Sequence, residues 1–359
     1  MGKSWRLSVL SVALVLLTAV WFIPGAAQLT ELQTLEGSGY TGIAWSPGGA
    51  MLATTRQNEV HLWDVSEQGI ARRSIFSGAA DTLGGLAFSP DGATVAAGSI
   101  QPTGMLSSNA QGVVYRWEVE SGRFLTPLVA EGSYNSGAPR HVAFSPDGRL
   151  LAFAYALHNG SCARWVERVV LFDVQTGALF DVSPRGNAQV FSLAFSPDSA
   201  LLAVNLGFSV CSITSGLVEV WDTAQRVQRA ALNVNTFGTR TSDILFSPDS
   251  EHLIINASPV PARQESLVHF WNASDFQEQA ALHFEKGIIS QLAMSPDGSI
   301  LAIAGDTGGL HLFDPRRSIL LTFVAASNSA IRNLAFSPDG AMLASLDEEG
   351  RARIWRIAM

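Results

Sequence analysis

The chain has 359 residues, of which 47% are hydrophobic and only 15% are charged, and its formal net charge is −8. The 31 acidic residues against 23 basic ones argue against nucleic acid or an anionic membrane surface as the partner. Length alone suggests two or more domains, whereas the low charge and high aliphatic content are typical of sheets packed face to face.

The segment 1–27 has the pattern of a signal peptide. Lys3 and Arg6 precede an apolar run over 7–23 that only hydroxyl side chains interrupt, and the small residues that end at Ala27 suit signal-peptidase cleavage. The alternative is an uncleaved anchor, because the run is slightly long for a signal core and slightly short for a membrane span. We predict cleavage, since a strand-like segment follows at 29–35 without a spacer. The body is expected to be exported, either secreted or periplasmic, and attached to a membrane only if the segment is retained.

A four-residue turn then recurs seven times along the chain. Ser suits the first position of a type I turn, Pro sets φ at the second, Asp tolerates the third and Gly relaxes the fourth. The seven copies are Ser46-Pro47-Gly48-Gly49, Ser89-Pro90-Asp91-Gly92, Ser145-Pro146-Asp147-Gly148, Ser196-Pro197-Asp198-Ser199, Ser247-Pro248-Asp249-Ser250, Ser295-Pro296-Asp297-Gly298 and Ser337-Pro338-Asp339-Gly340. Because each copy lies between two apolar runs, the sequence predicts seven hairpins.

The residues around each turn alternate with the period of a strand. Large apolar side chains stand four and two positions before each Pro, with a small residue between them in six of the seven copies, which indicates an inner strand buried on both faces. A third strand ends in an aromatic residue, usually followed by an acid: Trp63-Asp64, Trp117-Glu118, Phe172-Asp173, Trp221-Asp222, Trp271-Asn272, Phe313-Asp314 and Trp355-Arg356. Apolar segments such as 70–76 and 319–323 supply a fourth strand.

These repeats resemble the WD40-repeat family, in which repeats of about 40 to 45 residues form four strands each and an aromatic-Asp pair closes the third strand. The resemblance runs from about Gln28 to the C-terminus and implies an all-β fold: a seven-bladed propeller over residues 28–359 with four-stranded antiparallel blades. The repeats depart from the family in lacking the Gly-His pair of many blades, so the buried polar network that this His joins is expected to be absent or reduced.

The last repeat ends just after Trp355 and lacks its outer strand, whereas the segment 29–35 has no partner of its own. The resemblance implies that the N-terminal strand completes the last blade and closes the ring. Deletion of residues 28–36 is therefore expected to destabilise the whole ring.

Four consecutive repeats carry inserts between their second and third strands. The stretch from turn Pro to closing aromatic is short in blades 1, 6 and 7, where it covers 47–63, 296–313 and 338–355. It is longer in blades 2 to 5, where it covers 90–117, 146–172, 197–221 and 248–271.

By resemblance to the family, these inserts lie on the top face of the ring, near residues 99–112, 156–167, 206–216 and 258–267. The sequence favours a recognition surface there over loops that merely pack on one another. Its candidate contact residues are Met105, Leu106, Trp165, Phe208 and Ile213.

Both cysteines of the chain, Cys162 and Cys211, fall in these inserts at nearly equivalent places in neighbouring repeats. In an oxidising compartment this placement predicts a disulfide between them, the alternative being two free buried thiols.

Polar residues also stand five positions before the turn Pro in successive repeats, near the expected mouth of the central channel. They are His141, Ser192, Asp243, Gln291 and Asn333. A site for a cation or small polar ligand is one interpretation, and the simpler one is that strand ends near solvent are polar.

The sequence shows no nucleophile elbow, zinc-protease motif or phosphate-binding loop, so we predict no catalytic residue, no metal and no cofactor. The favoured interpretation is a non-catalytic scaffold that binds a protein or peptide through its top face and does not bind nucleic acid. The alternatives are a small-ligand or carbohydrate sensor at the channel mouth, or a propeller enzyme of the lactonase or esterase kind.

Overall fold

The structure is a computed structural model that contains only strands, turns and loops over the residues it describes. No helix is present in this part of the chain, and so none there is long and apolar enough to cross a membrane. The described residues are 27–66, 69–100, 113–129, 141–158, 165–182, 188–210, 213–234, 239–240, 243–259, 266–284 and 287–358.

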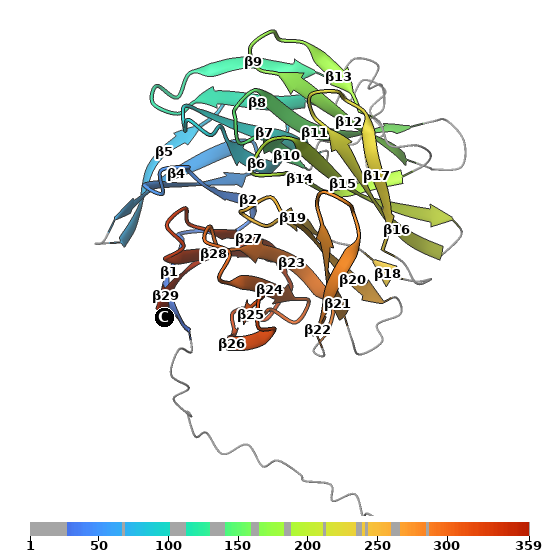
Figure 1. Ribbon diagram of the computed structural model, residues 1–359. Helices are drawn as coiled ribbons and strands as arrows, with labels where there is room; N and C mark the ends of the chain where they lie inside the picture. The colour runs from blue at the N-terminus through green and yellow to red at the C-terminus, as the bar shows by residue number, and fades with distance from the viewer. Residues whose placement is uncertain are drawn as a thin grey trace, which may run out of the picture.

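The strands form seven antiparallel sheets that follow one another around a ring (Figure 1). Blade 1 contains β2 (Tyr40–Trp45), β3 (Met51–Arg56), β4 (Glu59–Ser66) and β5 (Gly69–Phe76). Blade 2 contains β6 (Thr82–Phe88), β7 (Thr94–Ile100), β8 (Val113–Glu118) and β9 (Phe124–Val129). Blade 3 contains β10 (Val142–Phe144), β11 (Leu150–His158), β12 (Trp165–Asp173) and β13 (Leu179–Asp181). Blade 4 contains β14 (Ala188–Phe195), β15 (Leu201–Val210), β16 (Ile213–Asp222) and β17 (Gln228–Asn233).

Blade 5 contains β19 (Ile244–Phe246), β20 (His252–Pro259), β21 (Ser266–Asn272) and β22 (Glu278–Phe284), and the short β18 (Thr239–Arg240) pairs with the end of β20. Blade 6 contains β23 (Ile289–Met294), β24 (Leu301–Gly305), β25 (Gly309–Asp314) and β26 (Ile319–Ala325). Blade 7 contains β27 (Ile331–Phe336), β28 (Met342–Asp347), β29 (Ala352–Ala358) and, from the other end of the chain, β1 (Gln28–Thr34). The predicted seven-bladed fold is confirmed.

The seven Ser-Pro turns join the first and second strands of the blades. In every copy the fourth residue donates its N–H to the carbonyl oxygen of the Ser, at 2.8 or 2.9 Å, as a type I turn requires. In the six copies that contain Asp, the Ser hydroxyl donates to the Asp carboxylate and accepts the N–H of the residue four after the Pro, as at Ser337 with Asp339 and Met342. The turn thus satisfies its own polar groups at the start of the second strand.

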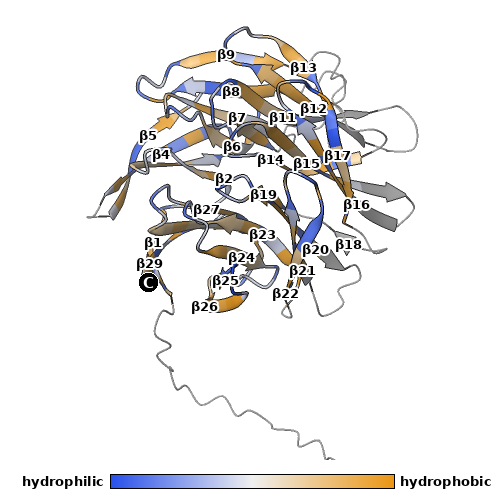
Figure 2. Ribbon diagram, viewed as in Figure 1, coloured by the Kyte–Doolittle hydropathy of each residue, from blue (hydrophilic) through white to orange (hydrophobic). Residues whose placement is uncertain are grey.

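The core of the molecule lies between the blades. Seven clusters of buried apolar side chains occupy the seven interfaces of neighbouring blades. The inner strands contribute to two clusters each, since Ile43 and Trp45 face blade 7 whereas Ala44 between them packs towards blade 2. This explains the small residue in the middle of most inner strands. In Figure 2 the hydrophobic colour follows the strands, and many connecting turns are hydrophilic.

The N-terminal strand closes the ring as predicted. β1 pairs antiparallel with β29 from Gln28 opposite Ala358 to Thr34 opposite Arg353. Leu29 joins the cluster between blades 6 and 7, and Leu35, just beyond the strand, joins the cluster between blades 7 and 1. The two ends of the chain therefore complete one blade together.

Candidate functional site: the top face and the channel mouth

Blades 3 and 4 carry long hairpins on the top face, which is the face where the second strand of each blade turns into the third. β15 and β16 pair over ten positions, from Leu201 opposite Asp222 to Val210 opposite Ile213. β11 and β12 pair over nine, up to His158 opposite Trp165, whereas β3 and β4 of blade 1 pair over six. Since a strand rises about 3.3 Å per residue, the hairpin of blade 4 extends roughly 13 Å further than that of blade 1.

In blades 3 and 4 the described parts of the inserts are strand extensions rather than loops. They continue the ladders of the ring, and in blade 5 Thr239 and Arg240 add a fifth strand against Pro259 and Ser258. Because a hydrogen-bonded hairpin fixes the order and spacing of its residues, the described part of the top face presents two extended ladders, in blades 3 and 4.

Three of the five candidate contact residues lie on these hairpins. Trp165 stands opposite His158 at the described end of blade 3's ladder. In blade 4, Phe208 stands between Ser215 and Ala188, and Ile213 is opposite Val210. Met105 and Leu106 lie outside the described residues, as do Cys162 and Cys211, so the disulfide stays a prediction.

The base of the blade 4 hairpin is packed against the first strand of its own blade. β14 has a bulge between Val190 and Ser192, so that Phe191 is the extra residue. A Cβ atom added at Gly207 would lie only 2.0 Å from the Phe191 ring, which means that a residue without a side chain is required there. The Phe191 ring therefore packs directly on the backbone at the base of the hairpin.

Two of the five polar residues of the channel mouth, Ser192 and Asp243, contact each other. The Oδ1 of Asp243 accepts hydrogen bonds from the Ser192 hydroxyl at 2.9 Å and from the N–H of Ile244 at 3.0 Å. Its Oδ2 accepts the N–H of Leu292 at 2.9 Å. One carboxylate therefore links blades 4, 5 and 6.

A buried asparagine extends this link. Asn256 accepts the N–H of Asp243 with its Oδ1 at 2.8 Å and donates its Nδ2 to the carbonyl oxygen of Ile289 at 3.1 Å. Thr55 has the equivalent position in blade 1, where its hydroxyl donates to the carbonyl oxygen of Gly84 in blade 2. Polar side chains of second strands thus join neighbouring blades in two parts of the ring.

Burial raises the pKa of Asp243 to about 6, and the three hydrogen-bond donors oppose this shift because they stabilise the charged form. Since its oxygens already accept three donors, the contacts give this carboxylate a structural role. His141, Gln291 and Asn333 are half-buried on other blades of the ring, and the Gln291 amide donates to the carbonyl oxygen of Ser290. These contacts favour the simpler interpretation of the polar ring without testing whether a ligand binds there.

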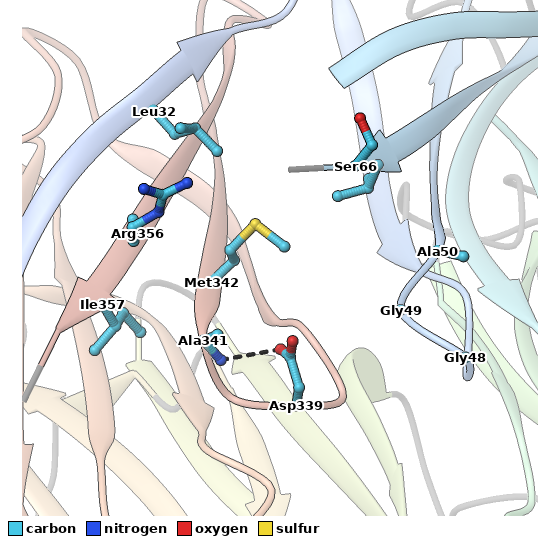
Figure 3. Close-up of a pocket in the computed structure, with 11 residues that line it drawn as sticks. Leu32, Gly48, Gly49, Ala50, Ser66, Asp339, Ala341, Met342, Arg356 and Ile357 are labelled. Atoms are coloured by element: carbon cyan, nitrogen blue, oxygen red, sulfur yellow. Dashed lines mark hydrogen bonds between the residues drawn. The ribbon is translucent and has the colours of Figure 1, made fainter. Parts of the chain in front are cut away.

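The structure also contains two grooves on the bottom face, which is the face of the Ser-Pro turns. The groove between blades 7 and 1 has a volume of about 500 Å³, and Figure 3 shows Leu32, Met342 and Arg356 on one side with Ser66 and Gly48 on the other. A similar groove of about 540 Å³ lies between blades 5 and 6. Sequence reasoning missed both, because each groove is formed by two blades together and no single repeat carries a signal for it.

Comparison with known protein families gives two matches, one in the first part of the sequence and one in the last. The family model described as "WD domain, G-beta repeat" matches residues 29–64 and 317–356. The first match runs from β1 into β4, and the second from the turn before β26 into β29. Each matched unit therefore consists of the outer strand of one blade and the three inner strands of the next. The three inner strands of the two units belong to blades 1 and 7, in which the second and third strands are joined by a short connection and the third strand ends at a Trp.

Proposed function

Because the chain belongs to the WD40-repeat family of β-propellers, we propose that it is a non-catalytic scaffold that binds a protein or peptide partner across its top face. Propellers of this family commonly serve as protein-interaction scaffolds. The proposed function includes export of the protein, since the pattern of the segment 1–27 is that of a signal peptide.

The observation that carries this proposal is the pair of long hairpins on neighbouring blades. Hydrogen-bonded strands hold contact residues in place before a partner arrives, which lowers the ordering cost of binding. Trp165, Phe208 and Ile213 are aromatic and apolar residues of the kind that dominate binding energies.

A hairpin exchange tests the proposal. Residues 206–217 are replaced by the segment that connects the same positions in blade 1, 56–59, so that Asn205 and Val218 keep the pairing that Thr55 and Val60 have. Partners are captured by crosslinking in the native host with the wild type, with this variant and with Ser66→Trp, a control on the exposed bottom face. The proposal predicts a partner that the wild type and the control capture and the exchanged variant loses.

Equal capture by all three folded proteins would contradict a top-face site. The alternative function, a small-ligand sensor at the channel mouth, is favoured only by the clustering of Ser192 and Asp243. It predicts that a small ligand raises the melting temperature of the wild type and of the hairpin variant alike.

A further inference from the structure

The groove between blades 5 and 6 combines an apolar floor with a charged rim. Its volume of about 540 Å³ is within the range of pockets that hold a side chain or small molecule. It lies on the bottom face, so it is separate from the long hairpins of the proposed function.

The floor is a row of side chains across blade 5. Ile254 pairs with Phe270, and Phe270 pairs with Ala280 on the outer strand, so the three share one face of the sheet. Met294 of blade 6 lines the same groove from the opposite side. Since Ala280 carries only a methyl group, the outer strand leaves the Phe270 side chain, which is half-buried, open to the groove.

The rim is acidic. Asp249 and Asp297, from the turns of the two blades, line the groove, and Glu251 lies close to Asp249 in sequence and space. Ligand-type atoms of Asp249, Glu251 and His252 all lie within 4.8 Å of one another, so one cationic group can reach both carboxylates. His252 is held in place by a contact of 2.9 Å between its Nε2 and the Oε1 of Gln279.

The charge on the rim is well defined near neutral pH. The hydroxyl of Ser247 bonds to the Asp249 carboxylate and lowers its pKa, and the hydroxyl of Ser295 does the same for Asp297. Among the lining residues, these two carboxylates stand against the single guanidinium of Arg316. Glu251 does not line the groove itself, but it adds a third carboxylate beside Asp249.

We propose that this groove binds a lysine or arginine side chain of a partner peptide whose neighbouring residues are apolar. The cationic head contacts the carboxylates of the rim, and the aliphatic stem and neighbours cover Phe270 and Met294, beneath which Ile254 is fully buried. A peptide side chain fits this site because the lining combines carboxylates with the apolar surfaces of Phe270 and Met294, which an aliphatic stem can cover and a bare metal ion cannot. The proposal rests on the scaffold function and deepens it by naming a second contact and its chemistry.

The groove between blades 7 and 1 is a matched comparison within the same chain. It has the same architecture and about the same volume, 500 Å³, but Gly48, Ala341 and Met342 occupy the places of Asp297, Glu251 and His252. Asp339 and Arg356 both line this groove, so its charges balance (Figure 3). Charge complementarity to a cation therefore distinguishes one groove from the other.

The test uses the full chain and a fluorescein-labelled peptide of sequence Gly-Leu-Lys-Leu-Gly, with a Glu in place of the Lys as the control peptide. Fluorescence anisotropy measures binding to the wild type, to Ala280→Trp, which fills the groove at an exposed position, and to Glu251→Gln, which removes one charge. Ser66→Trp, at an exposed position in the other groove, is the matched control variant.

We expect the Lys peptide to bind the wild type at least tenfold more tightly than the Glu peptide. Ala280→Trp should weaken binding at least tenfold and Glu251→Gln about threefold, whereas Ser66→Trp should have no effect. Equal binding of both peptides, or equal binding by Ala280→Trp and the wild type, would overturn the proposal. The hairpin-exchanged variant should bind the Lys peptide normally, so failure of the top-face function and failure of this groove are told apart.

Discussion

At the scale of single residues, the Ser of each turn holds together the start of two strands. Ser337 is fully buried, and its hydroxyl both donates to Asp339 and accepts the N–H of Met342 at 2.9 Å. Blade 1 has Gly48 in place of the Asp, so Ser46 keeps only the bond from Met51, at 3.0 Å. The same Ser therefore has an acidic partner in one blade and none in the other.

This difference predicts unequal costs for one substitution. Ser337→Ala should lower the free energy of unfolding by about 2 kcal/mol, and Ser46→Ala by about 1 kcal/mol, because each lost hydrogen bond in a buried place contributes roughly 1 kcal/mol. Urea unfolding at pH 7 measures both. The Ser337 hydroxyl lowers the pKa of Asp339, so the excess cost should shrink as the pH falls below about 4. Equal costs in the two blades would contradict this account.

Asp243 should make the folded ring more stable in acid, which is opposite to the effect of acid on the Ser337–Asp339 hydrogen bond. Burial raises its pKa from 3.8 to about 6, so between these values the folded state binds more protons than the unfolded state. Its contribution to stability is fully present below pH 3.8 and is lost as the pH rises through 6. A rise of this size corresponds to roughly 3 kcal/mol.

The prediction compares the wild type with Asp243→Asn, whose side chain cannot take up this proton. Between pH 7 and pH 4 the stability of the wild type relative to the variant should rise by up to about 3 kcal/mol. If the variant does not fold, Ser192→Ala serves instead, because losing one donor raises the pKa of Asp243 further, so the rise in stability should begin at higher pH and be larger than in the wild type. A constant stability difference across this range would show that the pKa of Asp243 is not raised.

At the scale of elements, the closing strand joins the first and last parts of the chain. Its removal exposes the edge of β29 and takes Leu29 and Leu35 out of two interface clusters. Deletion of residues 28–36 should cost about 5 kcal/mol, since burying each large side chain contributes roughly 2 kcal/mol and the ladder is lost as well. Thermal melting measures it. A chain that begins at Ala27 is the control, and a deletion variant that melts with this control would contradict the prediction.

The elements show how far the sequence predicts the fold. The turns, the inner strands and the closing strand all follow from local patterns, because type I turns and period-two strands are encoded within a few residues. The bonds between blades do not follow in this way. Ser199 and Ser250 take the place of Gly at positive φ, and their hydroxyls accept N–H groups of Asp147 and Asp198 in the preceding blades.

The channel-mouth site was predictable only in part, because local patterns identify its side chains but not the contacts between blades. The polar residues five positions before the turn Pro in blades 3 to 7 identified Ser192 and Asp243, but the backbone N–H of Leu292 that completes their contacts has no sequence signal.

The absence of Gly-His pairs predicts that the buried polar network of the blades is reduced. Part of this network is retained in blade 7. The hydroxyl of Ser345 accepts the indole N–H of Trp355 at 2.9 Å, and Ser327 bonds to Asp347 where no His is present. A serine in the place of the expected His carries no motif, so sequence reasoning could not identify this part of the network.

At the scale of the whole molecule, the ring should unfold as one unit. Repeat proteins that stack in a line lose cooperativity because each repeat contacts only its neighbours. Here the seven clusters all lie between blades, and β1 joins the last blade to the first, so no blade keeps its core when a neighbour opens. A closed ring of shared cores has no end from which unfolding can start cheaply.

Two optical probes check this prediction. Tryptophan fluorescence reports on blades 1 to 5 and 7, which contain residues such as Trp63, Trp117 and Trp355, whereas far-ultraviolet circular dichroism reports on all strands. Both should follow a single transition in urea with the same midpoint. Deletion of residues 28–36 opens the ring, so in that variant the two curves should separate as the terminal blades unfold first. Separate transitions in the intact protein would mean that the blade interfaces do not couple the ring.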